Sequence, residues 1–253
     1  MLRSSLRSVP SSSSPTRELT KDHPAPCLDE RNGFLEVLKG VWREESRCLM
    51  IAAFPDAHGL NDEMTSFYRE AVQNSDLSVG CFDLWDDRTA PMTKRQLYSY
   101  DVLFTAGGHV PTQRRWFESI RLRELLEGYP GLVVGTSAGS MNCAAEVYAW
   151  PEEPGESLLP AEALFFPGLG LARTIVLPHY QKLRDSWLDG RRLMEDITCG
   201  HSHGRAFLAI PDGSYVVVEG GVETVHGEAW LVADGRISPF CARGAQRKLT
   251  GQT

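Results

Sequence analysis

Apolar runs and amphipathic segments alternate along the first half of the chain. Each apolar run is short, rich in β-branched or aromatic residues, and ends in a turn signal, which is typical of buried parallel strands. These runs lie at 47–54, 77–85, 101–108 and 131–139. Between them, apolar positions at helical spacing predict helices at 61–73 and 111–129. Strands that alternate with helices over this length indicate βαβ units with helices on both faces of the sheet.

The second half of the chain has a different pattern. A further strand is expected at 172–180, followed by a helical segment at 185–197. From Arg205 onward, short apolar runs are separated by the turn sequences PDG, EGG and HGE, which predict an antiparallel meander on one edge of the sheet. The expected fold is therefore α/β, a three-layer sandwich with a mostly parallel central sheet and a C-terminal antiparallel meander.

The length of 253 residues suits one sizeable α/β domain, which we place at 31–245. Residues 1–30 and 246–253 are expected to be disordered tails. The first 26 residues are rich in Ser, Pro and Arg and carry no acid before Glu18. A mitochondrial transit peptide has a similar composition, whereas a secretory signal is excluded by the lack of an apolar core region.

The net charge and the cysteines limit the binding partners and the cellular compartment that we expect for this protein. The formal net charge of −7 disfavours nucleic acid and anionic membrane as general partners. No apolar run approaches the roughly 18 residues that a membrane span needs. The six cysteines include no CxxC pair and several lie in apolar runs, so we interpret them as reduced thiols in a cytoplasmic protein.

A candidate nucleophile lies at the end of the fourth predicted strand. Residues Gly135 to Gly139 read GTSAG and match the pattern G-x-S-x-G between a strand and a helix. On such a turn the Ser137 hydroxyl would stand clear of the sheet, beside the backbone amide of Ala138. The alternative is a serine that only caps a buried helix.

Two further segments could complete a hydrolytic site. The strand at 101–108 ends in Gly107-Gly108, and the Gly108 amide is the expected second donor to an oxyanion. His179 follows the strand at 172–180 and could act as general base at the same sheet edge. Candidate acids between serine and histidine are Glu152, Glu153 and Glu156.

These pieces resemble the serine peptidase family of aspartyl dipeptidase (dipeptidase E) and cyanophycinase. The matching segments read DVLFTAGGHVPTQ, GLVVGTSAGSMNCA and IVLPHYQ, and the resemblance covers roughly residues 45–220, as in a bacterial branch of the family. It implies a fold similar to class I glutamine amidotransferases, with Ser137 as nucleophile, His179 as base, and Gly108 and Ala138 as oxyanion amides. It favours Glu152 as the acid, with Glu153 as second choice.

The resemblance implies a peptidase that cleaves small peptides through an acyl-enzyme, with no cofactor and no metal. The segments around the substrate pocket depart from the dipeptidases, so aspartyl specificity does not carry over. Residues that flank the catalytic pieces could bind a peptide carboxylate or an acidic side chain: His109, Gln113, Gln181, Lys182 and Arg184.

Alternatives remain open at this stage. An esterase shares the G-x-S-x-G pattern, and a catalytically silent binding protein could use the same scaffold. Cys199, His201 and His203 lie close together, but no second cluster accompanies them, so we expect no zinc site. Exposed helix faces such as that of 111–129 could pair in a homodimer.

Overall fold

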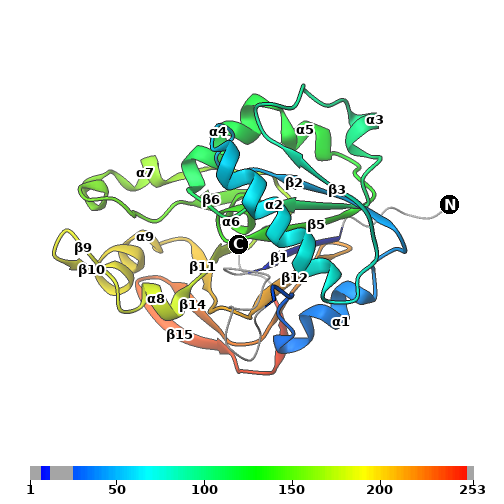
Figure 1. The fold of residues 1–253 in the computed structure, drawn as a ribbon. Coiled ribbons are helices and arrows are strands. Elements are labelled where there is room, and N and C mark those ends of the chain that lie inside the picture. The colour runs from blue at the N-terminus through cyan, green and yellow to red at the C-terminus, as the bar shows by residue number, and fades with distance from the viewer. Residues whose placement is uncertain (1–6, 12–24, 250–253) are drawn as a thin grey trace.

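The centre of the protein is an eight-stranded sheet (Figure 1). A computed structural model describes residues 7–11 and 25–249. From one edge to the other the strands are β16 (Gln246–Lys248), β13 (Val222–His226), β12 (Tyr215–Glu219), β1 (Arg7–Ser11), β5 (Leu132–Thr136), β4 (Val102–Thr105), β2 (Ser46–Ile51) and β3 (Val79–Trp85). The four strands predicted in the first half are β2, β3, β4 and β5, and they pair in parallel.

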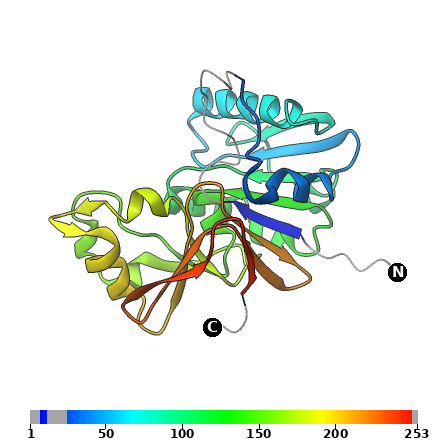
Figure 2. The same ribbon diagram turned by 90° about the horizontal axis from the view of Figure 1, so that it is seen from below.

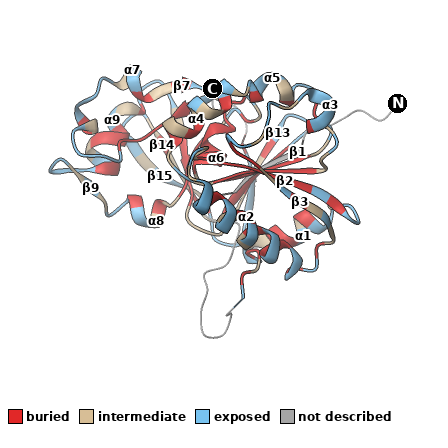
Figure 3. Ribbon diagram, turned by 45° about the horizontal axis from the view of Figure 1, so that its top comes forward, coloured by how far each residue is buried: buried red, intermediate tan, exposed pale blue. Residues whose placement is uncertain are grey.

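Helices cover both faces of this parallel part, because successive side chains of a strand point to opposite faces. Met50, Phe104 and Val134 pack against α1 (Phe34–Lys39) and α2 (His58–Gln73). Their neighbours Leu49, Leu103 and Val133 pack against α3 (Lys94–Leu97), α4 (Val110–Ser119) and α5 (Leu122–Leu126). The central strands are consequently buried on both sides (Figure 3).

The predicted C-terminal meander is divided between two sheets. Strands β12 and β13 extend the main sheet, whereas β14 (Ala229–Ala233) and β15 (Arg236–Cys241) belong to a second one. The second sheet continues through β11 (Ala206–Ala209) to β8 (Ile175–Leu177), which pairs with β11 in parallel. Val218 and Val225 of the main sheet share one buried cluster with Val176 and Leu208 of the second. The two sheets lie side by side in Figure 2.

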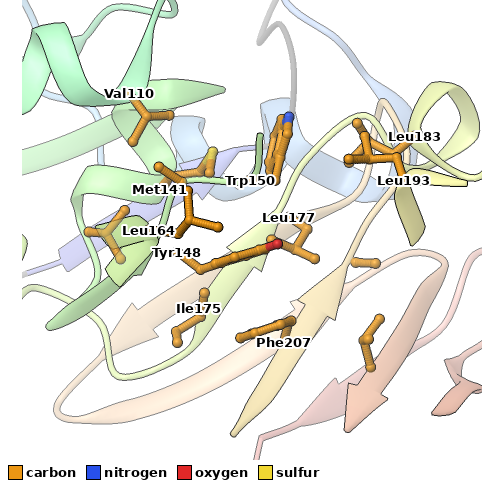
Figure 4. Close-up of a cluster of buried hydrophobic side chains, with 14 of the residues drawn as sticks. Val110, Met141, Tyr148, Trp150, Leu164, Ile175, Leu177, Leu183, Leu193 and Phe207 are labelled. Atoms are coloured by element: carbon orange, nitrogen blue, oxygen red, sulfur yellow. The ribbon is translucent and has the colours of Figure 1, made fainter. Parts of the chain in front are cut away.

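A further apolar cluster covers the other face of the second sheet (Figure 4). It joins this sheet to a set of short elements: α6 (Ala138–Asn142), β6 (Glu146–Tyr148), α7 (Ala161–Leu164), β7 (Phe165–Pro167), α8 (Tyr180–Leu183), η3 (Leu193–Thr198) and α9 (Cys199–His201). The 3-10 helix η2 (Glu156–Leu158) lies between β6 and α7 and contributes no side chain to the cluster. At its centre, Tyr148 stacks on Phe207 with ring centroids 4.7 Å apart. This packing fixes the end of β8, where His179 follows, relative to helix α6.

The helix expected at 185–197 is wrong over its first half. Strands β9 (Trp187–Leu188) and β10 (Arg191–Arg192) form a hairpin there, and helical structure begins only at Leu193. The two turn residues, Asp189 and Gly190, have φ of 51° and 76°. An Asp-Gly pair adopts this left-handed geometry readily, and it suits a two-residue hairpin loop.

The helix expected at 111–129 is interrupted. Arg121 has φ of 54° and separates α4 from α5. The break redirects the chain so that Phe117 of α4 and Leu122 of α5 both reach the same buried cluster.

Both expected tails are partly ordered, so the domain boundaries at 31 and 245 are too narrow. Strand β1 pairs with β5 on one side and with β12 on the other. These backbone hydrogen bonds do not depend on side-chain composition, so the composition of the segment does not predict them. Leu28 is buried, and β16 pairs with β13. Residues 1–6, 12–24 and 250–253 of the predicted tails lie outside the described residues.

Within residues 7–11 and 25–249, no helix is both long enough and apolar enough to cross a membrane.

Candidate active site

Ser137 lies on a strained turn between β5 and α6. Its backbone has φ of 47° and ψ of −115°, a combination that L-residues rarely adopt. The turn is crowded on both sides. A Cβ at Gly135 would lie 2.8 Å from Cα of Ser140, and a Cβ at Gly139 would lie 2.6 Å from Oγ1 of Thr105. Glycine is therefore required at both positions, and the structure has the strand–turn–helix context that the motif predicted.

The Gly139→Ala variant is expected to lose about 2 kcal/mol or more of unfolding free energy, because the new methyl group collides with the Thr105 backbone. Gly59→Ala is the matched control, since Gly59 lies in α2 with open space around its Cβ position. That change is expected to stabilise the protein by about 0.5–1 kcal/mol through helix propensity. Urea unfolding of both variants measures the difference; equal midpoints would contradict the described turn.

The histidine reaches the serine from the second sheet. His179 follows β8 in a left-handed conformation with φ of 62°, and its Nε2 lies 3.0 Å from Oγ of Ser137. We expected His179 at the same sheet edge as Ser137, but β8 lies in the neighbouring sheet. The two sheet ends adjoin through α6 and the apolar cluster around Tyr148.

The acid at the histidine is Asp212, whose Oδ1 lies 3.2 Å from Nδ1 of His179. Parallel strands end at the same edge of their sheet, so the loop after β11 lies beside the loop after β8. The Tyr180 N–H donates to the Ile210 carbonyl and fixes this adjacency. In the sequence, Asp212 follows the apolar run 206–210 within the turn PDG, so its place after a strand is the feature that could have identified it as a candidate acid.

The prediction that Glu152 or Glu153 holds the histidine is therefore corrected. Both residues are exposed, and both of their backbone N–H groups donate to Oε2 of Glu156, at 2.8 and 3.0 Å. Among the described residues, the carboxylate within hydrogen-bonding distance of Nδ1 of His179 is that of Asp212 and not that of either glutamate. Partial desolvation, followed by the charges of Glu156 and Glu153, raises the pKa of Glu152, while nearby His179 lowers it.

Of the two expected oxyanion donors, Ala138 follows the serine directly, and Gly108 lies in a turn that approaches it. Ala138 begins α6, where the first N–H groups of a helix have no partner within it. A Cβ at Gly107 would lie 3.3 Å from Cβ of Ser137, so the turn after β4 lies against the serine. At Gly108 a Cβ would lie 2.6 Å from Cβ of Ala53, which explains why glycine occupies this close approach.

Gln113 is predicted to bind substrate, but it is fully buried and supports the turn after β4. Its Nε2 donates to the Ala106 carbonyl at 2.7 Å, and its Oε1 accepts from Nδ2 of Asn142 at 3.0 Å. Asn142 also donates to the Val110 carbonyl at 3.2 Å. This network connects α6, at whose start Ser137 lies, to the segment that carries Gly107 and Gly108.

The other expected binding residues have different environments. His109 is half-buried directly after Gly108, and its Nδ1 lies 2.8 Å from Oγ1 of Thr112. The Gln181 side chain accepts a hydrogen bond from the backbone N–H of Asp212 at 3.1 Å. This bond ties Gln181 to the connection between β11 and β12 that carries Asp212, here called the acid loop. Arg184 is exposed and pairs with neighbouring Asp185, and Lys182 is also exposed.

The fold is similar to that of several solved structures, two of which are described here. A peptidase from an acI-B1 actinobacterium aligns over 97% of both chains at 14% identity, with a TM-score of 0.63. A protein of Listeria monocytogenes EGD-e, provisionally assigned to Peptidase E, aligns over 87% of this chain and 98% of its own, at 15% identity and a TM-score of 0.52. The chain shares a peptidase fold. No protein-family model and no curated protein matches the sequence.

A cysteine side chain also lies close to the Ser137 turn. All six thiols are free. Cys143 lies behind the turn, where a Cβ at Gly135 would be 3.1 Å from its Sγ, and desolvation raises its pKa to about 12. A thiol with this pKa is protonated near neutral pH and is a poor nucleophile.

The cluster of Cys199, His201 and His203 is not arranged as metal ligands. Cys199 and His201 lie in α9 rather than on a strand, and Nδ1 of His201 lies 2.9 Å from the buried Tyr148 hydroxyl. In the described part of the chain, no group of three or more His, Cys, Asp or Glu side chains converges as a metal site.

Proposed function

We propose that the protein is a serine hydrolase that cleaves small peptides through Ser137, His179 and Asp212. The observation that carries the proposal is the continuous chain of contacts, 3.0 Å from Ser137 Oγ to Nε2 and 3.2 Å from Nδ1 to Asp212. The strained backbone at Ser137, with its positive φ, and the two peptidases of similar fold support it.

Asp212 determines which nitrogen of His179 carries the proton. A carboxylate only accepts hydrogen bonds, so it selects the tautomer with hydrogen on Nδ1 and leaves Nε2 free to accept. As Ser137 Oγ attacks the peptide carbonyl carbon, its proton passes to Nε2. The amides of Gly108 and Ala138 then donate to the oxygen that becomes negatively charged.

Collapse of the tetrahedral intermediate breaks the C–N bond, and His179 returns the proton to the departing amine. The products of this step are the free amine and an ester between Ser137 and the acyl half of the substrate. Water attacks this ester, again with Nε2 accepting a proton, and releases the carboxylate and free enzyme. Half-buried His109, beside Gly108, remains a candidate contact for the substrate.

Incubation with a library of di- and tripeptides, followed by mass spectrometry, tests the function. We expect cleavage of a subset by wild type and none by Ser137→Ala. An active ester such as p-nitrophenyl acetate is included to recognise an esterase. Turnover of the ester alone would overturn the peptidase assignment. Turnover of neither substrate class by folded enzyme would favour a binding protein.

Thiol reagents are expected to leave most of the hydrolytic activity intact. Iodoacetamide near neutral pH should modify the partly exposed Cys27 and Cys81 before the buried thiols, because burial protects Cys48 and Cys143 and raises the pKa of both. Peptide mapping identifies the alkylated sites while residual activity is assayed. Inactivation in step with alkylation of Cys143 would mean that a thiol takes part in catalysis.

A further inference from the structure

The acid loop is held from two sides by side chains from distant parts of the chain. Asp212 lies between Pro211 and Gly213 in the short connection from β11 to β12. On one side the loop is hydrogen-bonded to Gln181, two residues after His179. On the other side it is hydrogen-bonded to Asn32, near the start of the described range 25–249.

Gln181 and His179 lie in the same turn of the chain, and both contact Asp212. His179 Nδ1 contacts the carboxylate of Asp212, and Gln181 Oε1 accepts the backbone N–H of the same residue at 3.1 Å. Both side chains project from residues at or next to the start of α8 (Tyr180–Leu183). The two contacts therefore fix both the position and the direction of the Asp212 side chain relative to the imidazole.

Asn32 holds the next residue of the loop. Its Nδ2 donates to the Gly213 carbonyl at 2.7 Å, and its own carbonyl accepts from the buried Tyr215 hydroxyl at 2.9 Å. Asn32 adopts the left-handed conformation, with φ of 55°, which asparagine tolerates better than most residues.

Two glycines make room for the side chains of Arg31 and Asn32. A Cβ at Gly213 would lie 2.6 Å from Cζ of Arg31, and a Cβ at Gly227 would lie 2.7 Å from Cγ of Asn32. Both glycines have positive φ, of 88° and 90°. The segment around Asn32 thus fits into a recess formed by the acid loop and the turn after β13.

We propose that Gln181 and Asn32 are positioning residues, which keep Asp212 in hydrogen-bonding distance of His179 without touching substrate. The inference rests on the proposed function. An acid on a short loop is effective only while the loop is fixed, because a displacement of about 1 Å in an active site can cost on the order of 100-fold in rate.

The test uses Gln181→Ala and Asn32→Gly in the full chain. Glycine is chosen at position 32 because alanine would be strained at a positive φ. We expect each change to lower kcat by roughly 10- to 100-fold with KM nearly unchanged. The kcat/KM pH profile should also change, which a loss of stability alone would not cause.

A double-mutant comparison shows whether the two residues act through Asp212. In an Asp212→Asn background, Gln181→Ala and Asn32→Gly are expected to cause less than about a two-fold further loss, because the group they position has lost its role. Full additivity of the losses would overturn the inference.

Asn74→Ala is the control for a loss of stability alone. The Asn74 side chain donates to the Pro26 carbonyl at 2.8 Å and ties the same N-terminal segment to the end of α2. In a parallel βαβ unit this end of the helix lies away from the carboxyl edge of the strands. The control should lower the thermal midpoint and leave kcat and the pH profile unchanged.

The outcomes separate this inference from the function on which it rests. If Asp212→Asn inactivates the enzyme while Gln181→Ala and Asn32→Gly retain wild-type kcat and pH profile, the positioning role is wrong and the hydrolase assignment stands. If Asp212→Asn retains full activity, the catalytic role of Asp212 and the positioning role both fail. Labelling rates with a fluorophosphonate, measured below each thermal midpoint, provide a second readout for any variant of low stability.

Discussion

Ser137→Ala is expected to lower kcat/KM for peptide cleavage by roughly 10⁴- to 10⁶-fold, because removal of a serine nucleophile disables the triad as a unit. The fold should survive the change. Alanine keeps the Cβ that lies against Gly107, and it is no more strained than serine at φ of 47°. Steady-state kinetics together with the thermal midpoint measure both effects.

Ser140→Ala is the matched control for this variant. Ser140 lies in the same short helix, and its Oγ donates to the Ser137 carbonyl at 2.6 Å rather than to the histidine. Loss of that bond should cost about 1 kcal/mol of stability and leave activity within roughly ten-fold of wild type. If Ser140→Ala were inactive and Ser137→Ala still active, the nucleophile would be Ser140, which would contradict the proposed role of Ser137.

Asp212→Asn is expected to lower kcat by about 10⁴-fold. An asparagine amide can donate to Nδ1 of His179, which places the proton on Nε2 and leaves that nitrogen unable to accept one from Ser137. Because Nδ1 of His179 and Oδ1 of Asp212 lie 3.2 Å apart, an asparagine amide at position 212 is close enough to donate to Nδ1 directly.

Glu152→Gln is the comparison, since sequence resemblance had favoured Glu152 for the same role. The Glu152 side chain is exposed and near His179 without a hydrogen bond to it in the described structure, so its neutralisation should change kcat by less than about ten-fold. Kinetics of the two variants side by side decide between the acids. A larger loss for Glu152→Gln than for Asp212→Asn would return the role to the glutamate.

The parallel strands could be predicted because burial on both faces leaves a strong sequence pattern. Leu49 and Met50, for example, are both apolar because they pack against helices on opposite sides. Strand β1 could not be predicted in this way, since its backbone pairs with β5 and β12 whatever the polarity of its residues. The division of the C-terminal strands between two sheets depends on long-range packing, such as the buried cluster that contains both Val225 and Val176, which local pattern does not encode.

The serine and histidine could be predicted because each lies in a short motif with local geometry. Gly135 and Gly139 report the crowded turn around Ser137, and Pro178 with the preceding apolar strand marks the position of His179. The signal for the acid is weaker, because Asp212 lies in the sequence PDG after an apolar run, which is equally typical of an ordinary turn. Which loop approaches Nδ1 depends on the pairing of β8 with β11, and that pairing brings Asp212 to His179 from 33 residues away.

The most direct test of the central claim is intact-mass spectrometry after treatment with a fluorophosphonate, which reacts with activated serines. We predict one adduct on wild type, mapped to Ser137, and none on Ser137→Ala. His179→Ala should be labelled far more slowly, because no base remains 3.0 Å from Oγ. Absence of an adduct on folded wild type, or equal labelling of Ser137→Ala, would contradict a catalytic serine at this position.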